Sequence, residues 1–153
     1  MKRLIVILIL AVALYGSPKV VHALGPDVPP YVSISVTPKI LNLGTLPFAS
    51  DFYESPGTLV LEVKSNCMHG HITASITELV HTSGCRIPPD RIYISTPATN
   101  GFVSMAKPVV ISDPTEGSHN IKMDFQVCNK FQIFHAGRYS GTLTFMVMPP
   151  AQP

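Results

Sequence analysis

Three cysteines and a short histidine-rich segment are the residues of this 153-residue chain whose types and spacing suit chemistry. Cys67, His69 and His71 occupy alternate positions, so in an extended segment their side chains project to one side. His135 lies in a later loop that strand counting places at the same end of the fold. Imidazole and thiolate ligands suit zinc or copper, which makes His69, His71 and His135 the candidate metal ligands. Gly70 indicates a turn that would break this projection, and solvated loop histidines are the alternative interpretation.

The cysteines Cys67, Cys85 and Cys128 also bear on a disulfide, because pairs of cysteines normally oxidise in exported proteins. If successive strands alternate in direction, the strands before Cys67 and Cys128 end at the same end of the fold, with Cys85 at the opposite end. This predicts a Cys67–Cys128 disulfide and leaves Cys85 over. The prediction depends on residues 101–112. If Pro108 separates two antiparallel strands there, Cys128 moves to the end that holds Cys85.

No catalytic signature accompanies these residues. Residues 137–141 place their serine one position later than the Gly-x-Ser-x-Gly motif requires, and before a strand. Residues 67–71 lack the second cysteine of a haem attachment site. The nine acidic residues are scattered singly, so no pair suits acid–base catalysis. We therefore expect a protein that is not an enzyme and that carries no cofactor besides the zinc or copper considered above.

The amino terminus has the pattern of an export signal. Lys2 and Arg3 precede the apolar residues 4–14, and Ala23 supplies the small residue that signal peptidase needs. This apolar run is shorter than the roughly 20 residues that span a bilayer. We expect residues 1–23 to be removed, and the protein to be periplasmic, at the cell surface or extracellular, with no integral membrane segment.

Removal of the signal changes the charge of the chain. Lys2, Arg3 and Lys19 leave with it, so eleven basic residues become eight against nine acidic ones, a formal charge of −1. No cluster of Lys and Arg remains, which argues against nucleic acid as a partner.

The elements that must position the cysteines and histidines are short β-strands. Apolar and polar residues alternate in six segments, and no helical stripe is present. The segments are 32–37, 59–64, 72–77, 91–95, 121–127 and 142–147, with weaker apolar stretches at 40–46 and 102–111. The pattern predicts an all-β fold, an immunoglobulin-like antiparallel β-sandwich of seven or eight strands. A closed barrel is the alternative.

The domain boundaries follow from this pattern. We expect a signal peptide over residues 1–23, a flexible leader over 24–30, a sandwich over 31–148 and a proline-rich tail over 149–153. Phe125 and Phe145 have the apolar parity of the two best-patterned strands, so both are expected to point into the core.

Residues 136–145 resemble the closing strand of bacterial secreted immunoglobulin-like modules, which include pilin-like and spore-coat-like surface subunits. Residues 41–44 followed by 57–61 are similar to the early strands of the same group. The resemblance implies a structural or interaction subunit of the cell surface or periplasm, with other protein subunits, itself included, as partners. Residues 32–37 could then add to the sheet edge of a neighbour, although pairing within the chain is the alternative. The alternative function is a soluble periplasmic zinc- or copper-binding protein.

Overall fold

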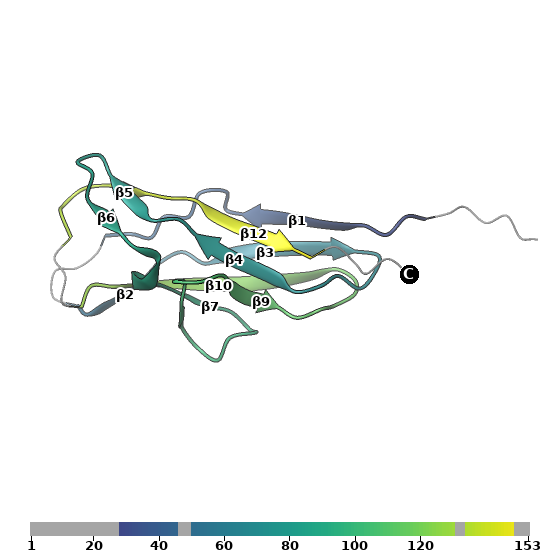
Figure 1. The fold of residues 1–153 in the computed structure, drawn as a ribbon. Coiled ribbons are helices and arrows are strands. Elements are labelled where there is room, and N and C mark those ends of the chain that lie inside the picture. Colours follow the sequence, from purple (N-terminus) through teal and green to yellow (C-terminus); the bar gives the residue numbers. More distant parts are fainter. Residues whose placement is uncertain (1–27, 46–49, 131–133, 149–153) are drawn as a thin grey trace, which may run out of the picture.

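The computed structural model describes residues 28–45, 50–130 and 134–148, and these form an almost entirely β structure with antiparallel pairing (Figure 1). Twelve strands and one short 3-10 helix lie in these ranges. They are β1 (Val32–Thr37), β2 (Phe52–Glu54), β3 (Leu59–Ser65), β4 (Ile72–Ile76), β5 (Leu79–His81), β6 (Arg86–Ile87), η1 (Pro89–Arg91), β7 (Ile92–Ser95), β8 (Val103–Ser104), β9 (Val109–Ser112), β10 (His119–Cys128), β11 (Tyr139–Ser140) and β12 (Leu143–Val147). The expected signal peptide and tail lie outside the described residues, as does the start of the leader.

The longest strand, β10, organises the largest sheet. This sheet has the order β1-β3-β10-β7-β8, and β2 also pairs with β10. The first half of β10 pairs with β3, with His119 opposite Val63 and Met123 opposite Leu59. Its second half pairs with β7, with Phe125 opposite Ile94.

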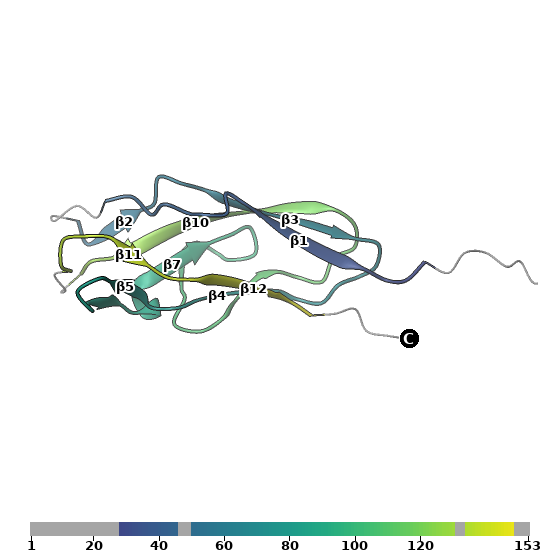
Figure 2. The same ribbon diagram turned by 90° about the horizontal axis from the view of Figure 1, so that it is seen from above.

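The remaining strands form two three-stranded sheets. Their orders are β12-β4-β9 and β11-β5-β6. In Figure 2, β1, β3 and β10 lie along one side of the molecule, and β4, β5 and β12 lie along the other. The inward side chains of all three sheets belong to a single hydrophobic cluster. Burial of this cluster supplies the main driving force for folding.

The alternation of apolar and polar residues located six of the twelve strands in the described residues. Each of the six alternating segments overlaps one strand of the structure over most of its length. Phe125 is 1% exposed, as expected for the centre of the core. Phe145 packs against the same cluster but is only partly buried, because β12 lies at a sheet edge.

The expected number of strands, seven or eight, is wrong for the described residues, because short strands were missed. The weak stretch 102–111 contains two of them. β8 pairs with β7 in the large sheet, whereas β9 pairs with β4 in another sheet. Pro108 lies between β8 and β9, where its missing amide hydrogen breaks no ladder. The stretch 40–46 forms no strand over residues 40–45.

Candidate functional site

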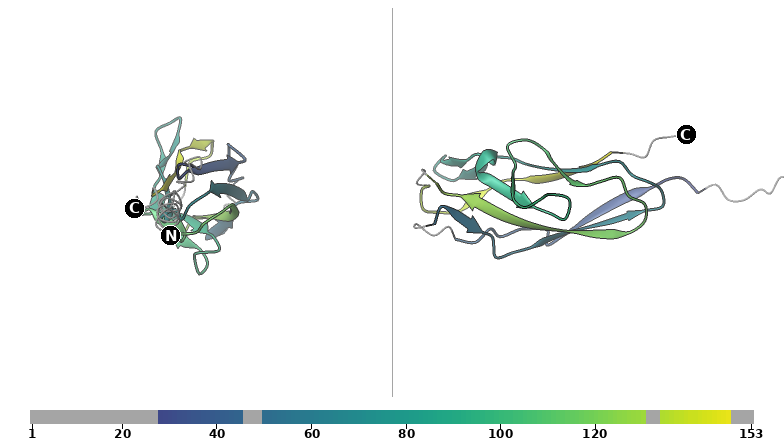
Figure 3. Two further views of the ribbon diagram at one scale, coloured as in Figure 1. Left: turned by 90° about the vertical axis from the view of Figure 1, so that its right-hand side faces the viewer. Right: turned by 90° about the horizontal axis from the view of Figure 1, so that it is seen from below.

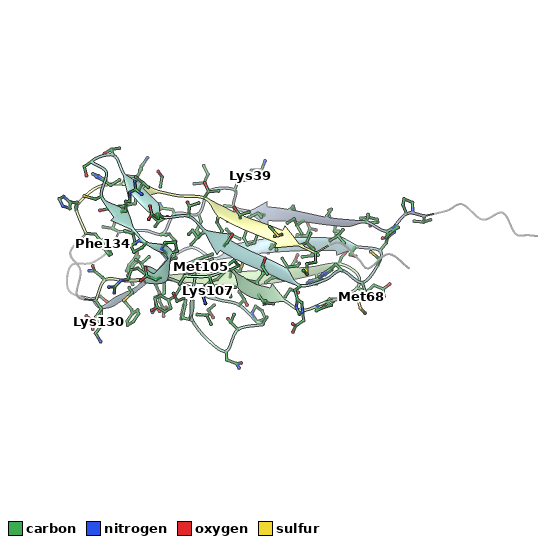
Figure 4. The ribbon with its side chains drawn as sticks, viewed as in Figure 1. Lys39, Met68, Met105, Lys107, Lys130 and Phe134 are labelled. Carbon is green, nitrogen blue, oxygen red and sulfur yellow. The ribbon has the colours of Figure 1, made fainter. Side chains whose placement is uncertain are left out.

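The elongated molecule has two ends, and the chemistry-bearing residues divide between them. The histidine end consists of the β3–β4 loop, residues 66–71, and the β9–β10 loop with the start of β10, residues 113–119. Figure 4 marks this end by Met68 and the opposite end by Lys130 and Phe134. The two loops are joined where the His69 amide donates a hydrogen bond to the Thr115 carbonyl at 3.3 Å.

The predicted metal ligands are not all brought together. His69 and His71 lie at the histidine end, next to the start of β4. His135 lies at the opposite end, where its carbonyl accepts a hydrogen bond from the Tyr139 hydroxyl at 3.1 Å. The strand pairing explains this separation. β12 runs antiparallel to β4, and β11, which follows His135 and precedes β12, pairs with β5 beyond the end of β4.

The expected Cys67–Cys128 disulfide is wrong for this structure, in which Cys67, Cys85 and Cys128 are all free. Because β10 runs antiparallel to β3, Cys128 at its end lies far from Cys67, which follows the end of β3. The ten residues of β10 extend over about 30 Å at the rise of a strand. The pairing was predicted wrongly because β8 and β9, the strands on either side of Pro108, reverse the direction assumed for β10. The sequence had indicated this possibility.

His69 is a buried side chain whose tautomer can be assigned. The residue is 1% exposed, and its Nδ1 lies 2.6 Å from the carbonyl oxygen of Gly70. A carbonyl oxygen only accepts, so Nδ1 carries the hydrogen, and in the neutral ring Nε2 presents a lone pair. That Nε2 is buried and has no hydrogen-bond partner. A buried polar atom left in this state costs about 1–3 kcal/mol, so it calls for an explanation.

His119 is the residue that the sequence analysis missed. Its ring stacks on that of His69, with centroids 5.5 Å apart and planes at 19°. Both ring nitrogens of His119 are buried and lack a hydrogen-bond partner. A signal was available in the sequence, because His119 has the same parity as the inward residues Ile121, Met123 and Phe125.

The solvent-exposed surface of the histidine end is polar. His71 Nδ1 lies 3.5 Å from Asp113 Oδ1, and both side chains are substantially exposed. A surface pocket is lined in part by His119 together with Ser112, Asp113 and Thr115. Within the described ranges, no three side chains of His, Cys, Asp or Glu are grouped so that they could hold a metal ion.

A second feature is the edge of β12 that faces away from β4. The Thr77 amide donates to the Thr142 carbonyl at 2.9 Å, and the Met148 amide donates to the His71 carbonyl at 3.3 Å. In an antiparallel pair the hydrogen-bonded residues alternate with residues whose backbone groups point outward. The backbone groups of Leu143, Phe145 and Val147 therefore face away from β4.

The same reasoning applies to β1. The Asn66 amide donates to the Tyr31 carbonyl at 3.3 Å, which extends the pairing of β1 with β3 by one residue. The backbone groups of Val32, Ile34 and Val36 therefore point away from β3. No described strand pairs with the outward edge of β1 or of β12. We call these two edges together the open side.

The apolar side chains along the open side are incompletely covered. Val32, Ile34 and Val36 on β1, and Leu143, Phe145 and Val147 on β12, pack against the core but are only partly buried. Both strands lie along the upper side of the molecule in Figure 1.

The carboxylate of Glu62 on β3 depends on the packing of β1 against β3, because it contacts a residue of β1. Glu62 on β3 accepts a hydrogen bond from the Ser35 hydroxyl of β1 at 3.0 Å and lies 3.0 Å from the Lys64 ammonium. The hydrogen bond from Lys64, followed by that from Ser35, lowers the pKa of Glu62 from its usual value.

No helix among the described residues is long and apolar enough to cross a membrane. Comparison of the whole chain with protein-family models and with curated protein sequences finds no match to either.

Proposed function

We propose that this chain is an exported, non-enzymatic subunit of the cell surface or periplasm that joins other copies of itself by strand addition at the open side. In this proposal the three sheets pack as one immunoglobulin-like sandwich, with the large sheet in one layer and the two small sheets in the other. Figure 3, which views the molecule from one end and from below, shows the arrangement of strands that motivates this assignment. The export pattern of the sequence and its resemblance to secreted surface modules support the compartment.

The observation that carries the proposal is the pair of matching edges. Each edge directs the backbone groups of three apolar residues outward, from Val32, Ile34 and Val36 on β1 and from Leu143, Phe145 and Val147 on β12. The strands have similar lengths, six residues for β1 and five for β12. When β1 of one copy pairs with β12 of the next, both rows of unpaired groups gain partners.

The sequences of β1 and β12 lack the features that usually protect an edge strand from association. Natural edge strands are usually protected from association by Lys, Pro or an inward charge. β1 has the sequence VSISVT and β12 has LTFMV, so neither contains a proline or a charged residue. Val32, Ile34 and Val36 also stay partly exposed, and a neighbouring strand would cover them.

The geometry of the pairing determines the kind of assembly. β1 and β12 are different surfaces, so their contact is heterologous, and a heterologous contact that does not close into a ring builds an open chain. The expected product is a filament or a linear oligomer of identical subunits.

A competition experiment tests the proposal. The exported protein is examined by sedimentation velocity over a range of concentrations, alone and with a synthetic peptide of residues 24–37. We expect concentration-dependent assembly that the peptide reverses, because the peptide occupies the β12 edge. The control peptide carries serine at positions 32, 34 and 36. A protein that stays monomeric at every concentration, or assemblies that ignore the 24–37 peptide, would contradict the proposal.

A further inference from the structure

The residues with free backbone groups on the open side are the same residues whose side chains pack against the core. This holds on both of its edges, for Val32, Ile34 and Val36 on β1 and for Leu143, Phe145 and Val147 on β12. The residues between them, such as Ser33 and Thr144, bond to their own sheet and have exposed side chains. On each edge, therefore, an outward backbone group and an inward side chain belong to one residue.

This parity distinguishes the two directions in which the edges can pair. In an antiparallel pair, residues that exchange hydrogen bonds lie directly opposite each other and have their side chains on the same face. In a parallel pair, a residue bonds to the two neighbours of the residue opposite it, so the bonded residues have their side chains on opposite faces. Only antiparallel pairing of β1 with β12 gives a continuous sheet whose apolar side chains share one face.

We propose that β1 of one copy pairs antiparallel with β12 of the next copy, with Ile34 opposite Phe145. The inference rests on the proposed function, which supplies the contact between the two edges. In this register every outward residue of both strands gains a partner, the other pairs being Val32 with Val147 and Val36 with Leu143. A slip of one residue turns the apolar side chains to the wrong face, and a slip of two leaves one outward residue of each strand without a partner.

The side chains fit this register. On the inner face, Ile34 lies opposite Phe145, and a β-branched residue opposite an aromatic one stabilises a sheet. On the outer face, Ser33 lies opposite Met146. No residue of β1 or β12 carries a charge, so the pairing brings no like charges together and buries none.

The direction of pairing determines how neighbouring copies are oriented. β1 runs away from the histidine end, because it is antiparallel to β3, which leads into the loop 66–71. β12 runs toward that end, because it is antiparallel to β4, which follows the same loop. The arrows of β1 and β12 accordingly point in opposite directions in Figure 1. Antiparallel pairing between copies therefore aligns their long axes in the same direction, and their histidine ends lie side by side.

Fluorescence energy transfer between copies of the full exported protein tests the orientation. Each copy carries one dye on an azide-bearing amino acid, which leaves the cysteines untouched. The dye replaces either Met68 at the histidine end or Thr82 in the β5–β6 turn at the opposite end, and both side chains are exposed (Figures 1 and 4). We expect transfer in the 68–68 and 82–82 mixtures to be at least roughly twofold more efficient than in the 68–82 mixture, because the two ends are separated by the length of β10, about 30 Å.

A crosslinking experiment tests the register. Ser33→Cys combined with Met146→Cys places two thiols directly opposite each other, at a spacing that a disulfide spans. We expect an intersubunit disulfide in this variant after mild oxidation, identified by peptide mapping. Thr37→Cys combined with Met146→Cys is the matched control, because position 37 lies four residues further along β1 and its thiol should stay out of reach.

The outcomes separate this inference from the proposed function. Transfer in the 68–82 mixture that equals or exceeds transfer in the 68–68 mixture would overturn the antiparallel direction and leave strand addition at the open side intact. A Ser33–Met146 pair that crosslinks no better than the Thr37–Met146 pair would overturn the register alone. Absence of transfer in all three mixtures, with only monomer in sedimentation velocity, would contradict the proposed function and this inference together.

Discussion

The Thr77 amide donates a hydrogen bond to the Thr142 carbonyl at 2.9 Å, and this contact determines which backbone groups of β12 are free. With Thr142 in a hydrogen-bonded pair, the next residue along the strand, Leu143, must direct its backbone groups away from β4. Phe145 and Val147 follow with the same parity. The register of β12 on β4 therefore directs the backbone groups of Leu143, Phe145 and Val147 outward, where they can pair with a further strand.

The two phenylalanines of the best-patterned strands should differ in their effect on stability. Phe125 is fully buried at the centre of the large sheet, so Phe125→Ala is expected to lower the free energy of unfolding by about 3–5 kcal/mol. Phe145 is only partly buried, so Phe145→Ala should cost less, about 1–2 kcal/mol. Urea denaturation of the monomer measures both values. Equal losses would show that Phe145 is as enclosed as Phe125, which contradicts an open side.

The cysteines should behave as separate thiols. Non-reducing peptide mapping of native monomer is expected to recover no Cys67–Cys128 crosslink, because the length of β10 separates the two residues. Alkylation should modify the half-buried Cys67 and Cys85 faster than Cys128, which is 5% exposed. Denatured protein, in which all three should react alike, is the control. Recovery of the crosslink from folded monomer would refute the observed pairing of β3 with β10.

The pKa of Glu62 should respond to Lys64 on the same strand, β3, and to Ser35 on the neighbouring strand, β1. Lys64→Ala is expected to raise it most and Ser35→Ala to raise it less, in the order of their contributions. Because this pKa is lower in the folded chain, the associated stabilisation is present above the usual pKa of a glutamate. It is lost as the pH falls through the lowered value. Glu62 is exposed to solvent, so the effect on overall stability should be small. NMR titration of the Glu62 carboxylate measures both shifts, and no change in Ser35→Ala would show that β1 does not rest on β3 in solution.

Much of the fold could be predicted from the sequence, and the errors have physical causes. Alternation located the segments that contain β1, β3, β4, β7, β10 and β12, because a half-buried strand shows its burial as a period of two. Short strands such as β8, with two residues, are too brief to show any period. Missing β8 and β9 as separate strands reversed the direction assigned to β10, and the predicted disulfide depended on that direction.

The site was harder to predict than the fold. His69 and His71 stood out because they are neighbours in the sequence, whereas His119 joins them only through the packing of two loops. His135 was grouped with them by the same mistaken strand count that misplaced Cys128. The free edges depend on which residues of β12 bond to β4, and alternation of side chains does not reveal that choice.

The central claim is that the outward backbone groups of β12 join one subunit to the next, and a single substitution tests it. Val147→Pro removes one outward amide hydrogen and places the proline ring against the incoming strand. The bonds to β4 are kept, since proline is tolerated on an edge strand where its nitrogen faces away from the ladder. Val147→Ala is the matched control, because it shortens the same side chain and keeps the amide.

Sedimentation velocity and electron microscopy of the two variants beside the wild-type protein, in a metal chelator, give the measurement. We expect the wild-type protein and Val147→Ala to assemble, and Val147→Pro to remain a folded monomer. Assembly of Val147→Pro to the same extent as Val147→Ala would contradict the account.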